Sequence, residues 1–228
     1  MQPVALATSA GPVSGAADAR FAAVVDAFAE NFEKRGEVGA SLCITLEGKP
    51  VVDVWGGRKT PDGDPWERDT VSIVFSCTKG ASALAAHMAA DRGLLDLDAP
   101  VARYWPEFAQ AGKEGARVRM MLDHSVGLPH VRGQLKPGAF YDYDYMCDVL
   151  ARETPFWKPG IRNGYHGVTS AWTVGEMVRR STGRRLGAFF RDEVAGPLGI
   201  DFHIGAPEAV SARTAPVIDA VPDPAAPP

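Results

Sequence analysis

The segment Phe75-Ser76-Cys77-Thr78-Lys79-Gly80 places a serine and a lysine three residues apart, where an apolar run gives way to an alanine-rich stretch. Residues three apart in a helix lie on one face, with Cβ atoms about 5–6 Å from each other, so the Lys79 ammonium can reach the Ser76 hydroxyl. Unpaired N–H groups in a first helical turn would also favour negative charge at the serine oxygen. The pattern indicates either a nucleophile beside its activating amine or a helix-start serine followed by an exposed lysine.

The residues on either side of this segment predict several helices and one hairpin. After Gly80, small and apolar residues at helical spacing predict a largely buried helix that stops at Arg92-Gly93. Before the segment, an amphipathic helix from Phe21 is followed by two alternating runs around Glu47-Gly48-Lys49, which are typical of a β-hairpin. Because a two-stranded hairpin is marginal alone, further strands are expected beside it. More helices are predicted over about 118–124, 169–182 and 186–194.

Composition excludes several classes of partner and site. The chain has 228 residues and a net charge of −4, with no long run of one sign, which argues against a nucleic-acid partner or an anionic membrane surface. No stretch is long enough to span a membrane, and the first twenty residues lack the pattern of a secretory signal, so we expect a cytoplasmic protein. The three cysteines are far apart and the five histidines show no metal-site spacing, so we expect no metal and no other cofactor.

The same reading predicts three parts along the chain. Residues 1–20 are rich in Ala, Gly and Ser and are expected to form a flexible N-terminal segment. Residues 21–205 carry the predicted helices and hairpin and are expected to form one domain. Residues 206–228 are rich in Pro and Ala and are expected to form a tail or linker. The sequence does not indicate an oligomeric state.

A second candidate group is the phenol of Tyr165, which lies in the glycine-flanked turn Gly164-Tyr165-His166-Gly167. The turn would allow the phenol to project into a cleft, although a tyrosine packed under a loop is the ordinary alternative. The G-x-S-x-G signature of α/β-hydrolases is missing, because the nearest match, Asp123-His124-Ser125-Val126-Gly127, lacks the first glycine. An α/β-hydrolase is therefore disfavoured.

Taken together, these motifs resemble those of the serine β-lactamase and penicillin-binding-protein superfamily, and most closely its family VIII carboxylesterases. Ser76 to Lys79 matches the S-x-x-K motif of the family, and Tyr165 lies where the family has the tyrosine of its Y-x-N motif. Other segments match as well, and the resemblance runs from about residue 38 to residue 205. The matching segments include Gly93–Val101, Tyr104–Phe108, Leu122–Pro129 and Pro197–Gly199.

The resemblance implies a fold, a reaction and roles for residues. The fold would be α+β and β-lactamase/transpeptidase-like, with a helical region and an N-terminal hairpin that belongs to an antiparallel sheet. Ser76 would attack a small-molecule ester or β-lactam, while Lys79 and Tyr165 share the proton and the Ser76 N–H binds the oxyanion. His166, beside the tyrosine, is expected to contact the substrate. No metal or other cofactor is implied.

Two departures from the family pattern leave alternatives open. Gly167 stands where the Y-x-N motif has asparagine, which fits esterase-like members. The third motif of the family, K-T-G or a variant such as H-G-G, does not occur before Pro228, so the chain is expected to be an incomplete domain without its C-terminal strands. The alternatives to an active carboxylesterase with weak β-lactamase activity are a truncated, inactive homologue and a cell-wall D,D-peptidase. The peptidase is disfavoured because no signal sequence is recognised.

Overall fold

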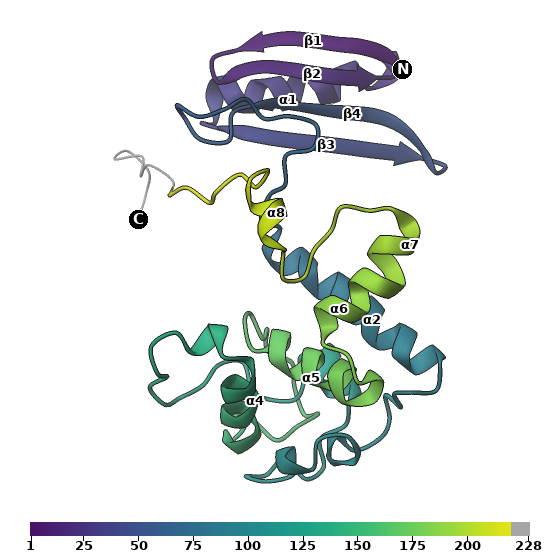
Figure 1. Cartoon of the computed structure of the whole chain (residues 1–228), viewed down its shortest axis with the longest axis vertical. Coiled ribbons are helices and arrows are strands. Elements are labelled where there is room, and N and C mark those ends of the chain that lie inside the picture. Colours follow the sequence, from purple (N-terminus) through teal and green to yellow (C-terminus); the bar gives the residue numbers. More distant parts are fainter. Residues whose placement is uncertain (220–228) are drawn as a thin grey trace. The chain divides into compact units, whose positions relative to one another are not determined.

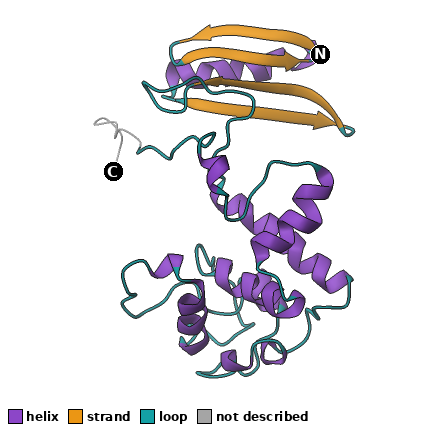
Figure 2. Cartoon of the chain, in the orientation of Figure 1, coloured by secondary structure: helices purple, strands orange, loops and turns teal. Residues whose placement is uncertain are grey.

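The computed structural model describes residues 1–219 and divides the chain into two compact units. One unit comprises Met1–Ile73 together with the residues from Ala206 onward, and the other comprises Val74–Gly205. The strands of the described chain all lie in the first unit, whereas the second is helical (Figure 2). The break falls at Val74, two residues before Ser76, so the nucleophile candidate begins the helical unit.

The first unit is a four-stranded antiparallel sheet covered by a helix (Figure 1). The strand order is β1-β2-β4-β3, and α1 (Ala22–Lys34) lies against the sheet. Phe28 and Phe32 of the helix pack on Val52 and Val54 of the sheet in one buried cluster, as the helical spacing of their apolar side chains predicts. The strands are β1 (Gln2–Thr8), β2 (Gly11–Ala17), β3 (Gly39–Leu46) and β4 (Lys49–Gly57).

The predicted hairpin is confirmed as β3 and β4, which pair antiparallel from Gly39 opposite Gly57 to Leu46 opposite Lys49. The two turn residues, Glu47 and Gly48, have φ angles of 51° and 75°. Positive φ at both positions matches the right-handed twist of the flanking strands. The turn chemistry that predicted the hairpin is therefore also what closes it.

The first twenty residues differ from the expectation of a flexible segment, because they contain β1 and β2. The sequence did not predict these strands because alanine and glycine give no alternating pattern of large apolar residues. The small residues are needed for packing: a Cβ at Gly15 would lie 2.1 Å from the Asp53 carbonyl oxygen on the neighbouring strand β4. Gly15 also has a φ of 136°, which residues with a Cβ rarely adopt.

Residues 206–219, expected to belong to a tail or linker, contain the short helix α8 (Glu208–Ser211) and a return to the strand unit. The Val71 N–H donates to the Arg213 carbonyl at 2.9 Å, and the Ala215 N–H donates to the Val71 carbonyl at 2.8 Å. These bonds tie residues 213–215 to the segment that leads into the nucleophile motif. The rest of the predicted tail, residues 220–228, lies outside the described residues.

The second unit is built around α2 (Thr78–Asp91) and α5 (Ser170–Thr182), which pack against each other. Three alanines of α2 are buried at the contact and let the two helices approach closely, while Leu84 of the same helix is exposed. The other helices are α3 (Arg119–Leu122), α4 (Tyr143–Arg152), α6 (Leu186–Phe190) and α7 (Gly196–Leu198), with a π-helical turn at Arg191–Ala195 and shorter turns at Phe75–Cys77, Val101–Arg103, Pro106–Phe108 and Ala139–Tyr141.

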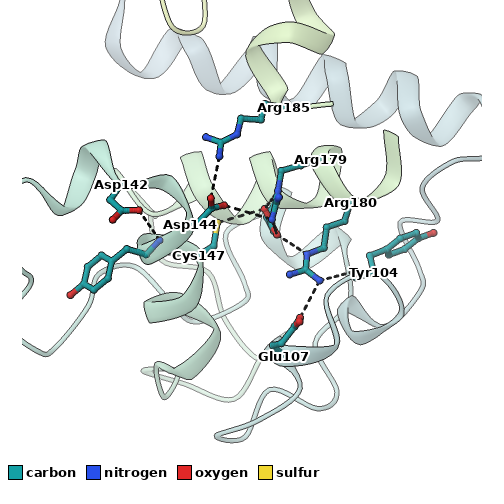
Figure 3. A network of polar contacts seen from close by, with 10 residues as sticks. Tyr104, Glu107, Asp142, Asp144, Cys147, Arg179, Arg180 and Arg185 are labelled. Atoms are coloured by element: carbon teal, nitrogen blue, oxygen red, sulfur yellow. Dashed lines mark hydrogen bonds and ion pairs between the residues drawn. The ribbon is translucent and has the colours of Figure 1, made fainter. Parts of the chain in front are cut away.

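Around a buried carboxylate of α5, Arg179 and Arg180 pair with Asp144 and Glu107 of neighbouring segments (Figure 3). Glu176 of α5 is 0% exposed and accepts hydrogen bonds from Arg179 and Arg180, and Arg180 also pairs with Glu107 at 3.0 Å. Hydrogen bonds from the two guanidinium groups outweigh the effect of burial and hold the pKa of Glu176 below its usual range. Within residues 1–219, every helix is too short or too polar to cross a lipid bilayer.

Candidate active site

The structure brings Ser76, Lys79 and Tyr165 together. Ser76 lies in the short 3₁₀ turn before α2, Lys79 lies in the first turn of α2, and Tyr165 lies in the loop before α5. The hydroxyl oxygens of Ser76 and Tyr165 are 2.6 Å apart, although 89 residues separate them in the chain. Lys79 Nζ donates to Ser76 Oγ at 3.1 Å. The serine hydroxyl therefore has a phenol and an ammonium within hydrogen-bond reach, which is the arrangement of an activated nucleophile.

A main-chain group fixes the position of the Lys79 ammonium. Lys79 Nζ donates to the Gly167 carbonyl oxygen at 2.7 Å and lies 4.8 Å from the centroid of the Tyr165 ring. Gly167 is the residue that stands where asparagine was expected from the family motif. Its backbone oxygen therefore supplies an acceptor for the lysine at that point without any side chain.

The environment of Tyr165 favours its ionised form. The hydrogen bond with Ser76 and then that with Lys79 lower the pKa of the Tyr165 phenol from its ordinary value of 10.0. A hydroxyl or ammonium that donates to the phenol oxygen stabilises the phenolate more than the neutral phenol. A phenol with a lowered pKa can accept the proton of a neighbouring hydroxyl, so this group is suited to act as a general base.

Comparison with known proteins identifies the family of the chain. A family model described as Beta-lactamase matches residues 21–228 of the chain. The chain belongs to the beta-lactamase family. It is similar to the Esterase/beta-lactamase LipL of Mycobacterium tuberculosis, with 43% identity over 199 residues that cover 86% of this chain and 46% of the relative.

Solved structures of family members have the same fold. A family VIII carboxylesterase matches with a TM-score of 0.83 and 42% identity, over 89% of this chain and 56% of that chain. A penicillin-binding protein homologue from Caulobacter crescentus matches with a TM-score of 0.87 and 38% identity, over 92% of this chain and 58% of that chain. The predicted resemblance and the α+β, β-lactamase-like fold are thus confirmed. The chain spans about half the length of these relatives.

Two residues of the candidate site have unusual backbone geometry. Phe75, directly before the nucleophile candidate, has a φ of 42°, and His124 has a φ of 65°. Residues with a Cβ rarely occupy this left-handed region, and such strain is concentrated at functional sites. The bend at Phe75 lets Ser76 fall in the first turn of the helical segment, where backbone N–H groups lack partners within the helix.

His124 is a residue of the site that the sequence analysis did not select. Its Nδ1 accepts a hydrogen bond from the His166 N–H at 3.2 Å, and its ring centroid lies 5.2 Å from that of Tyr165. Burial and then the positive charge of Lys79 lower the pKa of His124 below its ordinary value of 6.5, which favours the neutral imidazole. The available signal was its position in Leu122–Pro129, a segment that matches the family but does not by itself assign a role to the histidine.

His166 does not take the expected role of a substrate contact. Its side chain is 1% exposed, its Nε2 accepts from the Leu128 N–H at 2.8 Å, and its Nδ1 lies 2.6 Å from the Gly164 carbonyl oxygen. Both ring nitrogens are therefore occupied by the main chain. This corrects the sequence expectation: adjacent residues of a turn point in different directions, and the imidazole holds the turn in place while Tyr165 faces Ser76.

A pocket of about 330 Å³ opens beside Ser76. It is lined by the residues around the nucleophile candidate and by parts of α2, α3 and α5. Its walls include Lys79 and His124, whereas Tyr165 is not among its lining residues. Over residues 1–219, no group of three or more His, Cys, Asp or Glu side chains is arranged to hold a metal ion.

Proposed function

We propose that this protein is a serine carboxylesterase that works through an acyl-enzyme on Ser76, with slower action on β-lactam amides. The observation that carries the proposal is the position of the Ser76 hydroxyl, 2.6 Å from the Tyr165 hydroxyl and 3.1 Å from Lys79 Nζ. The similarity to LipL and to a family VIII carboxylesterase supports the same reaction class. The substrate would be a small-molecule ester.

In the acylation step, Ser76 Oγ attacks the ester carbonyl while its proton passes to the Tyr165 oxygen. The carbonyl electron pair moves onto oxygen, where the Ser76 N–H at the start of the helical segment stabilises the negative charge. When the bond to the alcohol breaks, Tyr165 returns the proton to the leaving oxygen. Lys79, held by the Gly167 carbonyl, donates a hydrogen bond to Ser76 Oγ and lies beside the Tyr165 ring.

In the deacylation step, a water molecule attacks the acyl-enzyme and gives its proton to Tyr165, which then passes it to the departing Ser76 oxygen. Cleavage of esters is favoured over cleavage of amides, because the alkoxide of an ester can leave with less protonation than the nitrogen of an amide requires. The site offers Tyr165 as that donor, and the acceptor for Lys79 at position 167 is a main-chain carbonyl instead of a side-chain amide. We therefore expect β-lactams to be processed more slowly than esters.

The test is hydrolysis of p-nitrophenyl butyrate together with covalent labelling by a fluorophosphonate, located by peptide mass spectrometry. We expect the label on Ser76, and we expect Ser76→Ala to lower turnover by at least about 10³, which is the scale expected for loss of a covalent nucleophile. Ser41→Ala, at an exposed position of β3, serves as the matched control and should keep wild-type activity. Unchanged turnover in Ser76→Ala would contradict the proposal.

A second candidate, an incomplete homologue that is acylated but turns over poorly, is favoured by one observation. The chain matches 46% of LipL, so the comparison identifies no counterpart for groups in the rest of that relative. Loss of a single oxyanion donor typically lowers kcat by about 10² to 10³. Stoichiometric labelling of Ser76 without multiple turnovers would favour this candidate, whereas sustained hydrolysis would favour the esterase.

A further inference from the structure

The turn that carries Tyr165 is held on both sides by His124. The Gly164 N–H, directly before the tyrosine, donates to the His124 carbonyl oxygen at 3.2 Å. The His166 N–H, directly after the tyrosine, donates to His124 Nδ1 at 3.2 Å. One residue therefore binds both neighbours of Tyr165, through its main chain on one side and through its imidazole on the other.

The position of the Tyr165 hydroxyl depends on this turn more than on packing. The tyrosine is 60% exposed, and its ring contacts include the His124 ring, at 5.2 Å between centroids, and Lys79 Nζ, at 4.8 Å from the centroid. A shift of the turn would move the hydroxyl away from Ser76 Oγ, which lies 2.6 Å from it. Misplacement of a reacting group by about 1 Å can lower a rate about 10²-fold.

The contacts of the two imidazoles define their tautomers. A main-chain N–H can only donate, so His124 Nδ1 must be an acceptor and the proton of the neutral ring lies on Nε2. A carbonyl can only accept, so His166 Nδ1 carries the proton that faces Gly164, and its Nε2 accepts from the Leu128 N–H. Both rings are therefore neutral in this arrangement.

The surroundings of His124 keep its Nδ1 unprotonated near neutral pH. The charged or titratable groups around it are Lys79, Asp123, Tyr165 and His166. Burial and then the charge of Lys79 lower the pKa of His124 below 6.5, although Asp123 opposes this effect. The His166 ring stacks on that of His124 with 5.4 Å between centroids, so a charge on one ring disfavours a charge on the other. Nδ1 gains a proton only as the pH falls through a value below 6.5.

We propose that His124 is the positioning residue for Tyr165: its unprotonated Nδ1 keeps the Tyr165 hydroxyl against Ser76 and releases it on protonation. A protonated Nδ1 would be a donor that faces another donor, the His166 N–H, so their hydrogen bond would be lost. The bond from Gly164 to the His124 carbonyl does not titrate, so the turn loosens on one side only. The effect on hydrolysis rests on the proposed esterase function, whereas the position of the hydroxyl does not.

The first experiment determines the tautomer of His124 in the whole chain from long-range ¹H–¹⁵N NMR spectra of the histidine side chains. The His124 signals are identified by their loss in His124→Asn. We expect the proton on Nε2 and a bare Nδ1 at pH 7.5. A proton on Nδ1 at that pH would overturn the proposal, because such a nitrogen cannot accept from the His166 N–H.

The second experiment compares two substitutions of His124 that suit its left-handed φ of 65°. His124→Asn keeps an acceptor, because its Oδ1 is bonded to Cγ as Nδ1 is, whereas His124→Gly removes it. The readout is the pKa of the Tyr165 phenol, from its ¹³Cζ NMR signal, which Tyr165→Phe identifies. We expect His124→Asn to keep the lowered pKa of Tyr165 and His124→Gly to return it toward 10.0. The same pKa in both variants would overturn the proposal.

The third experiment uses only the wild type and His124→Asn, and so does not depend on the glycine variant. It measures the rate of Ser76 labelling by a fluorophosphonate from pH 5 to pH 8. The neutral fraction of His124 falls by up to about tenfold per pH unit below its pKa, so the wild type should lose up to that much more rate than the variant. Protonation of His166 or Tyr165 affects both proteins alike.

His87→Asn, at an exposed position of α2, is the control and should follow the wild type. Parallel pH profiles for the wild type and His124→Asn would overturn the proposal. If the pKa of Tyr165 depends on the acceptor at position 124 but no ester is hydrolysed, the esterase function fails and the positioning role stands. If esters are hydrolysed and both His124 variants match the wild type, the function stands and the positioning role is refuted.

Discussion

Replacing Glu176 with alanine should destabilise the helical unit by more than the loss of packing volume explains. The Glu176 carboxylate is fully buried and accepts three hydrogen bonds from arginines, from Arg179 Nε at 2.7 Å, from Arg179 Nη2 at 2.6 Å and from Arg180 Nε at 2.6 Å, and a weaker one from Cys147 Sγ at 3.6 Å. Without this carboxylate, Arg179 and Arg180, both labelled in Figure 3, lose their common partner. Arg180, which belongs to α5, would keep its own ion pair with Glu107 but lose the carboxylate that orients its guanidinium group.

The size of the effect follows from opposing terms. Hydrogen bonds to charged groups contribute about 1.5–3 kcal/mol each, but the desolvation of the ions opposes this gain. Breaking a fully buried ion pair costs about 3–5 kcal/mol. The side chains of Arg179 and Arg180 are 34% and 27% exposed, so water can partly solvate them in the variant. We therefore expect Glu176→Ala to lower the free energy of unfolding by about 3 kcal/mol, and Glu176→Gln by about 1–2 kcal/mol.

Urea unfolding followed by tryptophan fluorescence measures this loss, because Trp105 and Trp172 are buried in the same unit. Glu114→Ala, an exposed position of that unit, is the control and should change stability by less than about 0.5 kcal/mol. Since the native pKa of Glu176 lies below 4.5, its contribution is complete above pH 4.5 and declines as the pH falls below that value. A difference of less than about 1 kcal/mol at pH 7 would refute the reasoning.

Three further predictions concern the site. Tyr165→Phe should lower kcat for esters by about 10² to 10⁴ with little change in KM. Tyr141, which is 96% exposed, provides the control, and Tyr141→Phe should leave kcat unchanged. Full activity in Tyr165→Phe would show that the tyrosine is not the general base. Burial lowers the pKa of His166 below 6.5, so the free energy of unfolding should decrease as the pH falls below 6.5, by at most about 1.4 kcal/mol per pH unit from this residue. His166→Asn should make the free energy of unfolding less dependent on pH in this range. The same pH dependence in the variant and the wild type would contradict a buried, neutral His166. Gly164→Ala would place a Cβ 2.4 Å from Cη2 of Trp157, so we expect esterase activity to fall by at least about tenfold. Gly133→Ala, whose Cβ would meet no atom within 4 Å, is the control and should keep wild-type activity. Equal activity in the two variants would show that the turn at Gly164 can shift without loss of function.

The sequence predicted the local parts of the site better than the distant ones. The approach of Lys79 to Ser76 follows from helical spacing alone, because both residues lie within one turn. The contact between Ser76 and Tyr165 spans 89 residues, and no local rule predicts it, so it came from the family resemblance. His124 escaped notice because its role depends on a left-handed backbone and on ring contacts with residues about forty positions away.

The differences in the fold have similar causes. Strands β1 and β2 are made largely of small residues, and the close packing that requires Gly15 is visible only once β4 lies beside it. His166 was selected because it follows Tyr165, but direction within a turn depends on backbone angles that a single sequence does not specify. Its partners, the Leu128 N–H and the Gly164 carbonyl, are main-chain groups that leave no mark in the sequence.

The main-chain carbonyl that holds Lys79 makes this part of the site tolerant of mutation. Every residue type has a carbonyl oxygen, so no substitution at position 167 deletes the acceptor, provided that the backbone keeps its path. A Cβ at Gly167 would meet only the Tyr165 ring, at 3.7 Å, which is an ordinary contact. Position 167 can therefore change in the course of evolution while the Lys79 ammonium stays within hydrogen-bond distance of Ser76.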